Sequence, residues 1–106
     1  MKLQITKEAI SKLKELQPHS HSILALKYDT DGCGCGVNGM PTIEFKMEQD
    51  KADKLVENDV FTVTVHYHQS VFFANKMRLD FNGQTFRLSS NEGVLNPFIS
   101  INQLTA

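Results

Sequence analysis

The sequence predicts a mainly β domain of the α+β class, with one amphipathic helix near the N-terminus packed on the strands. Three observations lead to this fold class. Apolar residues recur at helical spacing between residues 7 and 17, whereas much of the remaining chain alternates apolar and polar residues, as half-buried strands do. The dipeptide Asn82-Gly83, a strong hairpin turn signal, lies between two such alternating stretches.

A short strand and the helix form the first part of the chain. Residues 2–5 alternate polar and apolar side chains, and Thr6 is a suitable N-cap. The helix is predicted from Lys7 to Gln17, because Pro18 ends it. One buried stripe is expected from four apolar residues of this helix: Ala9, Ile10, Leu13 and Leu16.

Strand patterns dominate the rest of the chain. Strands are predicted at residues 23–29, 41–48, 60–68, 77–81 and 85–90. In the third of these, four side chains are expected to share one face: Phe61, Val63, Val65 and Tyr67. Residues 70–76 are predicted to form a short helical turn or an irregular link. The C-terminal stretch contains Gly93 and Pro97 and is predicted to be irregular or an edge strand.

Length and charge limit the classes of function. The 106 residues are expected to form one domain, residues 1–106, with a core of its own. The net charge of −1 provides no basic field for phosphates, so nucleic acid is not expected as a partner. The longest apolar runs are too short to cross a bilayer, and the N-terminus lacks an apolar signal core. A cytoplasmic protein without a membrane partner is therefore predicted.

The stretch DTDGCGCGVNG, residues 29–39, holds both cysteines and four of the six glycines. It does not fit a calcium loop, because glycine arrives at the fourth position instead of the sixth. It does not fit a phosphate-binding loop either, because a strand-like stretch follows instead of a helix N-terminus. Thiolates suit iron, iron–sulfur units, zinc or copper(I), and the glycines let the backbone bend around an ion. A glycine-rich turn with two inert thiols is the other interpretation.

Most of the chain resembles the HesB/IscA-like family of iron–sulfur cluster biogenesis proteins, the A-type carriers, and above all the short relatives of low-GC Gram-positive bacteria. The likeness is carried by four stretches: ITKEAISKLKEL, LALKYDTDGCGCGVNGMPTIEF, VFTVTVHYHQSVFFANKMRLDF and GQTFRLSSNEGVLNPF. The resemblance implies a buckled mixed β-sheet or pseudobarrel with one N-terminal helix. It also implies iron or an iron–sulfur cluster as the bound species, and the assembly machinery or apo client proteins as partners.

In the family, one cysteine in the glycine loop and a C-terminal pair together hold the iron or cluster at a subunit interface. By its distance to the following IEF, Cys35 matches the first of these, and Cys33 is an addition. The stretch NPFISINQLTA contains no cysteine, so the C-terminal pair is missing from this sequence. Cys33 would compensate if a homodimer supplied four thiolates in all. Cys35 and Cys33 are therefore the predicted cofactor-binding and metal-binding residues.

Two histidines are secondary candidates for metal ligands. His66 and His68 are two residues apart in a predicted strand and would point the same way, on the polar face with Thr62 and Thr64. A solvated strand end is the other interpretation of this pair. Asp29 and Asp31 are expected to cap the turn through hydrogen bonds of their own side chains.

No Ser-His-Asp order, catalytic carboxylate pair or nucleotide fingerprint is present, so no catalytic residue is predicted and an enzyme is not expected. The leading hypothesis is an iron–sulfur assembly or carrier protein that binds its cargo through the glycine-rich Cys-x-Cys loop. The alternative is a HesB-like interaction or regulatory module that has lost the C-terminal cysteines and binds no metal. A thiol redox sensor is a third hypothesis, against which the nearby acidic residues count because they raise thiol pKa values.

Overall fold

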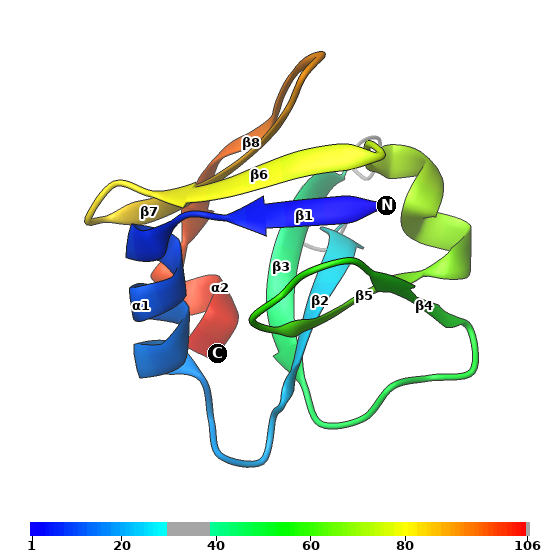
Figure 1. Cartoon of the computed structure of the whole chain (residues 1–106), viewed down its shortest axis with the longest axis horizontal. Coiled ribbons are helices and arrows are strands. Elements are labelled where there is room, and N and C mark those ends of the chain that lie inside the picture. Colours follow the sequence, from blue (N-terminus) through cyan, green and yellow to red (C-terminus); the bar gives the residue numbers. More distant parts are fainter. Residues whose placement is uncertain (30–38, 106) are drawn as a thin grey trace.

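The computed structural model of the chain describes residues 1–29 and 39–105. Its strands form two sheets that share one apolar core, with one helix at each end of the chain (Figure 1). In chain order the elements are β1 (Lys2–Ile5), α1 (Lys7–Leu16), β2 (Ile23–Asp29), β3 (Met40–Lys46), β4 (Asp53–Val56), β5 (Thr62–His66), the 3-10 helix η1 (Tyr67–Phe72), β6 (Lys76–Phe81), β7 (Thr85–Ser90), β8 (Gly93–Ser100) and α2 (Ile101–Thr105).

Both sheets have four strands and mixed pairing. The first has the strand order β1-β6-β7-β8 and the second β3-β2-β5-β4. Each contains one parallel pair, β1 with β6 and β2 with β5, and its other pairs are antiparallel. Parallel neighbours need a crossover connection, so strands far apart in the sequence lie side by side. The predicted mainly β fold with mixed pairing and an N-terminal amphipathic helix is confirmed.

Helix α1 forms where the sequence predicts it. The Thr6 hydroxyl accepts a hydrogen bond from the Ala9 N–H at 3.4 Å, which satisfies one of the free amides of the first turn. At the other end the Gln17 N–H donates to the Leu13 carbonyl at 2.9 Å, one residue before Pro18. Ala9 and Leu13 are completely buried, so the predicted stripe does face the core.

The edge strand β1 connects the two sheets. Leu3 is 1% exposed, and its N–H donates to the carbonyl of Glu57, just beyond β4, at 3.0 Å. The Asn58 side chain donates to the Leu3 carbonyl at 2.8 Å, and the Glu57 N–H donates to the Met1 carbonyl at 2.9 Å. Because these bonds satisfy backbone groups at the sheet edge, the first strand also stabilises the end of β4.

The predicted hairpin is confirmed in β6 and β7. The Asn82 side-chain oxygen accepts the N–H groups of Gln84 and Thr85, both at 2.9 Å. Gly83 has φ +98°, a conformation that residues with a Cβ atom rarely adopt. The turn residues therefore fix the register in which Phe81 pairs with Phe86.

Two predicted strands are too long. Strand β3 ends at Lys46, and Met47 beyond it is 59% exposed. Strand β5 ends at His66 because the His66 ring accepts the His68 N–H at 3.1 Å and caps η1. Since β5 also begins only at Thr62, the predicted 60–68 strand is wrong at both ends. Tyr67 consequently leaves the face that it was predicted to share and is 63% exposed.

The C-terminal segment agrees with the edge-strand prediction and adds a helix. Strand β8 lies at the edge of the first sheet, and its pairing with β7 shifts register on either side of Leu88. Helix α2 follows it, and Leu104 of this helix is 5% exposed. A helix of five residues is too short to give a periodic pattern, and the sequence did not predict it.

Candidate functional site

The β2–β3 hairpin frames the segment that carries both cysteines. Asp29 ends β2 and pairs in register with Met40, the first residue of β3. Residues 30–38 lie outside the described part of the chain, so the predicted ligands Cys33 and Cys35, and the turn role predicted for Asp31, lie outside it too. What the structure describes is the base from which this segment leaves and to which it returns.

Tyr28 anchors this base to η1. Its hydroxyl accepts the N–H of Gly39, the residue before β3, at 3.1 Å. Its own N–H donates to the Gln69 side-chain oxygen at 3.0 Å. Its ring stacks on Phe72 with the ring centroids 3.7 Å apart and an interplanar angle of 11°. One residue next to the cysteine segment is therefore held by a hydrogen bond within the hairpin and by two contacts to η1.

Asn96 anchors the other side of the hairpin to β8. Its side-chain nitrogen donates to the Pro41 carbonyl at 2.7 Å, and its side-chain oxygen accepts the Phe98 N–H at 3.0 Å. Asn96 is only 5% exposed, and its bond to the Pro41 carbonyl is shielded from water. The bond to Pro41 fixes the start of β3 against β8, the edge strand of the other sheet.

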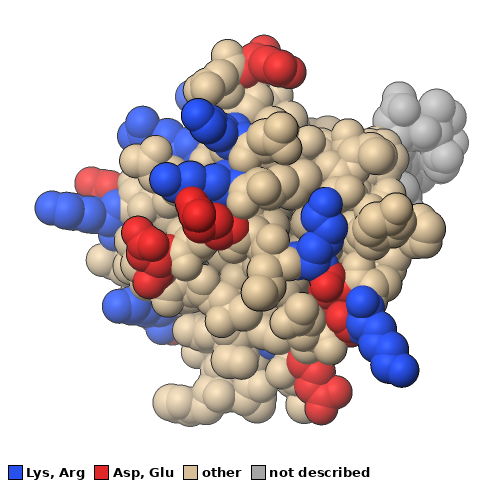
Figure 2. Space-filling view, turned by 45° about the vertical axis from the view of Figure 1, so that its right-hand side comes forward, with Lys and Arg blue, Asp and Glu red and all other residues tan. Residues whose placement is uncertain are grey.

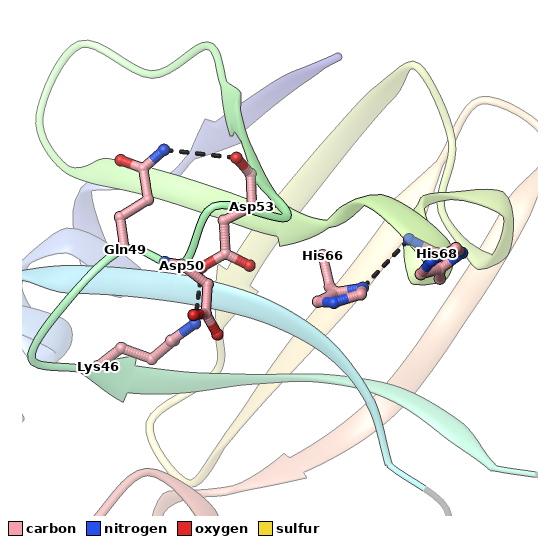
Figure 3. A network of polar contacts seen from close by, with 6 residues as sticks. All are labelled: Lys46, Gln49, Asp50, Asp53, His66 and His68. Carbon is pink, nitrogen blue, oxygen red and sulfur yellow. Dashed lines mark hydrogen bonds and ion pairs between the residues drawn. The ribbon is translucent and has the colours of Figure 1, made fainter.

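His66 and His68 do not lie on one strand as predicted. His66 is the last residue of β5 and His68 lies in η1, with their ring centroids 5.5 Å apart (Figure 3). Because Nδ1 of His66 accepts the His68 N–H, a neutral His66 carries its proton on Nε2 and has no free lone pair for a metal. Binding a metal there would require His66 to give up this hydrogen bond or that proton. Thr64, predicted on the same polar face, is fully buried.

Next to His66, a polar network joins β3 to β4 (Figure 3). Lys46 Nζ lies 2.7 Å from an Asp53 carboxylate oxygen, which also accepts the Asp50 N–H at 2.9 Å. Burial alone would raise the pKa of Asp53, whose side chain is 3% exposed. The hydrogen bonds from Lys46 and Asp50, together with the charge of Lys46, more than offset that and hold the pKa below its ordinary value.

This network lines a shallow pocket of about 170 Å³ on the outer face of the second sheet. Lys27 and Glu44, also in its wall, form an ion pair at 3.5 Å. The charged groups here are paired with one another, and within residues 1–29 and 39–105 no group of three or more His, Cys, Asp or Glu side chains could hold a metal ion.

Sequence patterns did not identify the residues that hold the base of the hairpin. Tyr28, Gln69 and Asn96 act through partners that are distant in the sequence, such as Gln69 for Tyr28 and Pro41 for Asn96. The one local signal was the position of Tyr28, directly before the Asp-rich start of the glycine loop. Nothing in the alternation of β2 separates it from an ordinary strand residue.

Comparison with known proteins identifies the class of protein. A sequence profile of the iron–sulphur cluster biosynthesis family, Fe-S_biosyn, matches residues 1–103, and the chain belongs to this family. Among individual proteins, it is similar to the uncharacterised protein YqkB of Bacillus subtilis strain 168. The two are 36% identical over 78 residues, which cover 72% of this chain and 73% of YqkB.

Solved structures share the fold. A Lactobacillus acidophilus protein assigned to Fe-S biosynthesis superimposes with a TM-score of 0.73 at 21% identity, over 93% of this chain and 86% of that one. IscA with a [2Fe-2S] cluster superimposes with a TM-score of 0.65 at 18% identity, over 92% of this chain and 98% of IscA. In the described residues of the present chain, no helix has both the length and the apolar character needed to cross a membrane.

Proposed function

We propose that this protein binds iron or an iron–sulfur cluster through Cys35 and Cys33 and delivers it to other proteins in the cytoplasm, without being an enzyme. Membership of the iron–sulphur cluster biosynthesis family supports a role in this process. Two thiolates are soft ligands of the type that iron and iron–sulfur clusters take. The assembly machinery and apo client proteins are the partners that this role implies.

The anchored base of the β2–β3 hairpin is the observation that carries the proposal. The ends of the cysteine segment are held in register by the pairing of Asp29 with Met40. Tyr28 and Asn96 attach the two strands to η1 and β8, respectively. A fixed base reduces the conformational entropy that the segment loses when both thiolates bind one ion.

A homodimer follows from counting ligands. The sequence holds two cysteines, whereas iron in a cysteine shell needs about four donors. Two cysteine segments that meet across a symmetric interface would supply them, with one iron or cluster per dimer. Since the donors would be shared between chains, binding should shift the association equilibrium toward the dimer.

Anaerobic reconstitution with iron and sulfide, followed by native mass spectrometry, tests this proposal. The wild-type protein should take up one metal unit per dimer, and Cys35→Ser should reduce uptake more than Cys33→Ser does. The matched control is His66→Ala/His68→Ala, which should retain uptake.

Two outcomes would overturn the assignment. Equal metal uptake by the wild type and by the variant with both cysteines replaced would show that the cysteines are not the ligands, and absence of uptake in both would favour the interaction module that binds no metal. Loss of uptake in the histidine variant alone would move the site to the end of β5.

A further inference from the structure

A groove with two chemically different ends runs along the β7–β8 hairpin on the side that faces β1, β6 and η1. It consists of three adjoining depressions, of about 380, 390 and 340 Å³. The first and second share Lys76 and Asn91, and the second and third share Phe73 and Glu92. The shared walls make the depressions one continuous surface.

The end of the groove over β1 and β6 is basic. Among the described residues, its wall contains the cations Lys2, Lys76 and Arg78 and no carboxylate. Hydrogen-bonding groups from β1, β7 and the turn after β7 complete it: Gln4, Ser89, Ser90 and Asn91. Figure 2 shows Lys and Arg side chains gathered at the upper left of the view, with acidic side chains at their margins. The whole chain has a net charge of −1, so this concentration of positive charge is local.

The positive charges at this end are incompletely neutralised. Lys2 and Lys76 lie side by side in the register of the parallel strands, an arrangement of like charges that costs free energy. Glu57 lies 3.8 Å from Lys2 and Asp80 lies 3.1 Å from Arg78, in pairs that are largely exposed. In the described part of the chain, no carboxylate lies within ion-pairing distance of Lys76. An anionic group between these cations would relieve the repulsion.

The end of the groove next to η1 is apolar. Val71 is 79% exposed, Val94 is 44% exposed and Phe72 is 43% exposed, and all three line this end. Phe72 also stacks on Tyr28, so this end lies next to the base of the cysteine segment. Exposed apolar side chains that are close together mark surfaces that bind other molecules.

We propose that this groove binds an extended segment of a partner protein in which acidic residues adjoin apolar residues. Charge complementarity places the acidic residues against Lys2, Lys76 and Arg78. The apolar residues then lie against Val71, Phe72 and Val94. Glu92, between the two ends, disfavours a ligand that is acidic along its whole length. The residues that carry the proposal are not the predicted metal ligands, so the proposal does not depend on metal binding.

Fluorescence anisotropy with synthetic peptides tests this inference on the full chain. The probe is a fluorescein-labelled peptide with a block of Asp and Glu next to a block of Leu and Val, made in both block orders. One order should bind more tightly than the other, and binding should weaken when salt is raised. Peptides with Lys in place of the acidic block, or Ser in place of the apolar block, should bind more weakly.

Variants of the protein assign the binding to the groove. Lys76→Gln/Arg78→Gln should weaken binding about tenfold, since each exposed charge pair contributes up to about 1 kcal/mol. The matched control is Lys14→Gln/Lys54→Gln, which removes two exposed lysines outside the groove and should leave affinity unchanged. Glu92→Gln should strengthen binding, and Val94→Ser should weaken it. Cys33→Ser/Cys35→Ser should bind the peptide as tightly as the wild type does. The peptide experiment can therefore succeed or fail independently of the metal reconstitution.

Two results would overturn the proposal. If Lys14→Gln/Lys54→Gln weakened peptide binding as much as Lys76→Gln/Arg78→Gln, the peptide would be attracted non-specifically to positive charge on the protein surface. Displacement of the peptide by inorganic phosphate, together with indifference to the apolar block, would assign the basic end to a small anion instead of a protein segment.

Discussion

At the scale of single residues, the hairpin that carries the cysteines depends on a few side chains with several partners each. Tyr28 is the clearest case, because its hydroxyl, its N–H and its ring each contact a different residue. The hydroxyl contact can be removed alone, since phenylalanine keeps the ring that stacks on Phe72.

Tyr28→Phe should lower the free energy of unfolding by about 1 kcal/mol, the typical net contribution of one hydrogen bond. The Gly39 amide loses its acceptor, so its hydrogen exchange should become about fivefold faster, which is the change in rate that corresponds to about 1 kcal/mol. Urea unfolding and amide exchange measure the two effects. The control is Tyr67→Phe, because Tyr67 is 63% exposed and should tolerate the change. Unchanged exchange at Gly39 would show that this contact does not hold the base of the hairpin.

Local sequence signals predicted the residues whose partners are near in the chain. Thr6 caps a helix three residues ahead, and Asn82 accepts hydrogen bonds from two of the next three residues. Gln69 is 41 residues from its partner Tyr28, and Pro41 is 55 residues from its partner Asn96, so no local pattern specifies these two contacts. The two cysteines were identified as the candidate site by the glycine-rich Cys-x-Cys pattern and the family resemblance, and their ligand role remains a prediction.

At the scale of elements, the Asp53 carboxylate joins the end of β3 to the start of β4. Its pKa is held below the ordinary value of 3.8, mainly by Lys46, against the opposing effect of burial. A carboxylate with a lowered folded-state pKa contributes stability above the unfolded value and loses it as the pH falls through the folded value. The contact should therefore be fully present at neutral pH and lost in strong acid.

Asp53→Asn should lower the free energy of unfolding by about 2 kcal/mol at pH 7, because a hydrogen bond to a charged group is lost. The difference from the wild type should shrink as the pH falls below 3.8. Urea unfolding at a series of pH values measures this dependence. Asp59→Asn, at an exposed carboxylate, is the control and should have little effect at any pH. A difference that does not change with pH would mean that the charge of Asp53 does not stabilise the fold.

The ends of elements were harder to predict than their existence. Alternation continues through Tyr67 in the sequence, yet β5 stops at His66 because the imidazole caps η1. Alternation also predicted the wrong burial for Thr64, which lies among outward-facing residues of β5 but is fully buried. Its hydroxyl oxygen has no protein partner among the described residues. Periodicity reports which way a side chain points, whereas burial also depends on what the rest of the chain places over it.

At the scale of the whole molecule, the two sheets share one core and are connected through β1. Leu3→Ala should cost about 3 kcal/mol, as expected for a fully buried leucine. Because the core is continuous, protection of amides in both sheets, such as those of Val65 and Leu88, should fall by the same amount. Native-state hydrogen exchange measures this, with Leu55→Ala as the control at a position that is 64% exposed. A loss restricted to one sheet would show that the sheets unfold separately.

The parallel pairing of β1 with β6 also orders events during synthesis of the chain. Lys2 pairs with Lys76, so β1 leaves the ribosome long before its partner strand has been translated. The pairing of β2 with β3 needs no residue beyond Lys46, whereas Gln69, Phe72 and Asn96 are translated after it. Both thiols therefore emerge on the nascent polypeptide before the contacts that hold the base of their segment can form. During that interval, the surrounding cell and not the fold determines which metals and oxidants they meet.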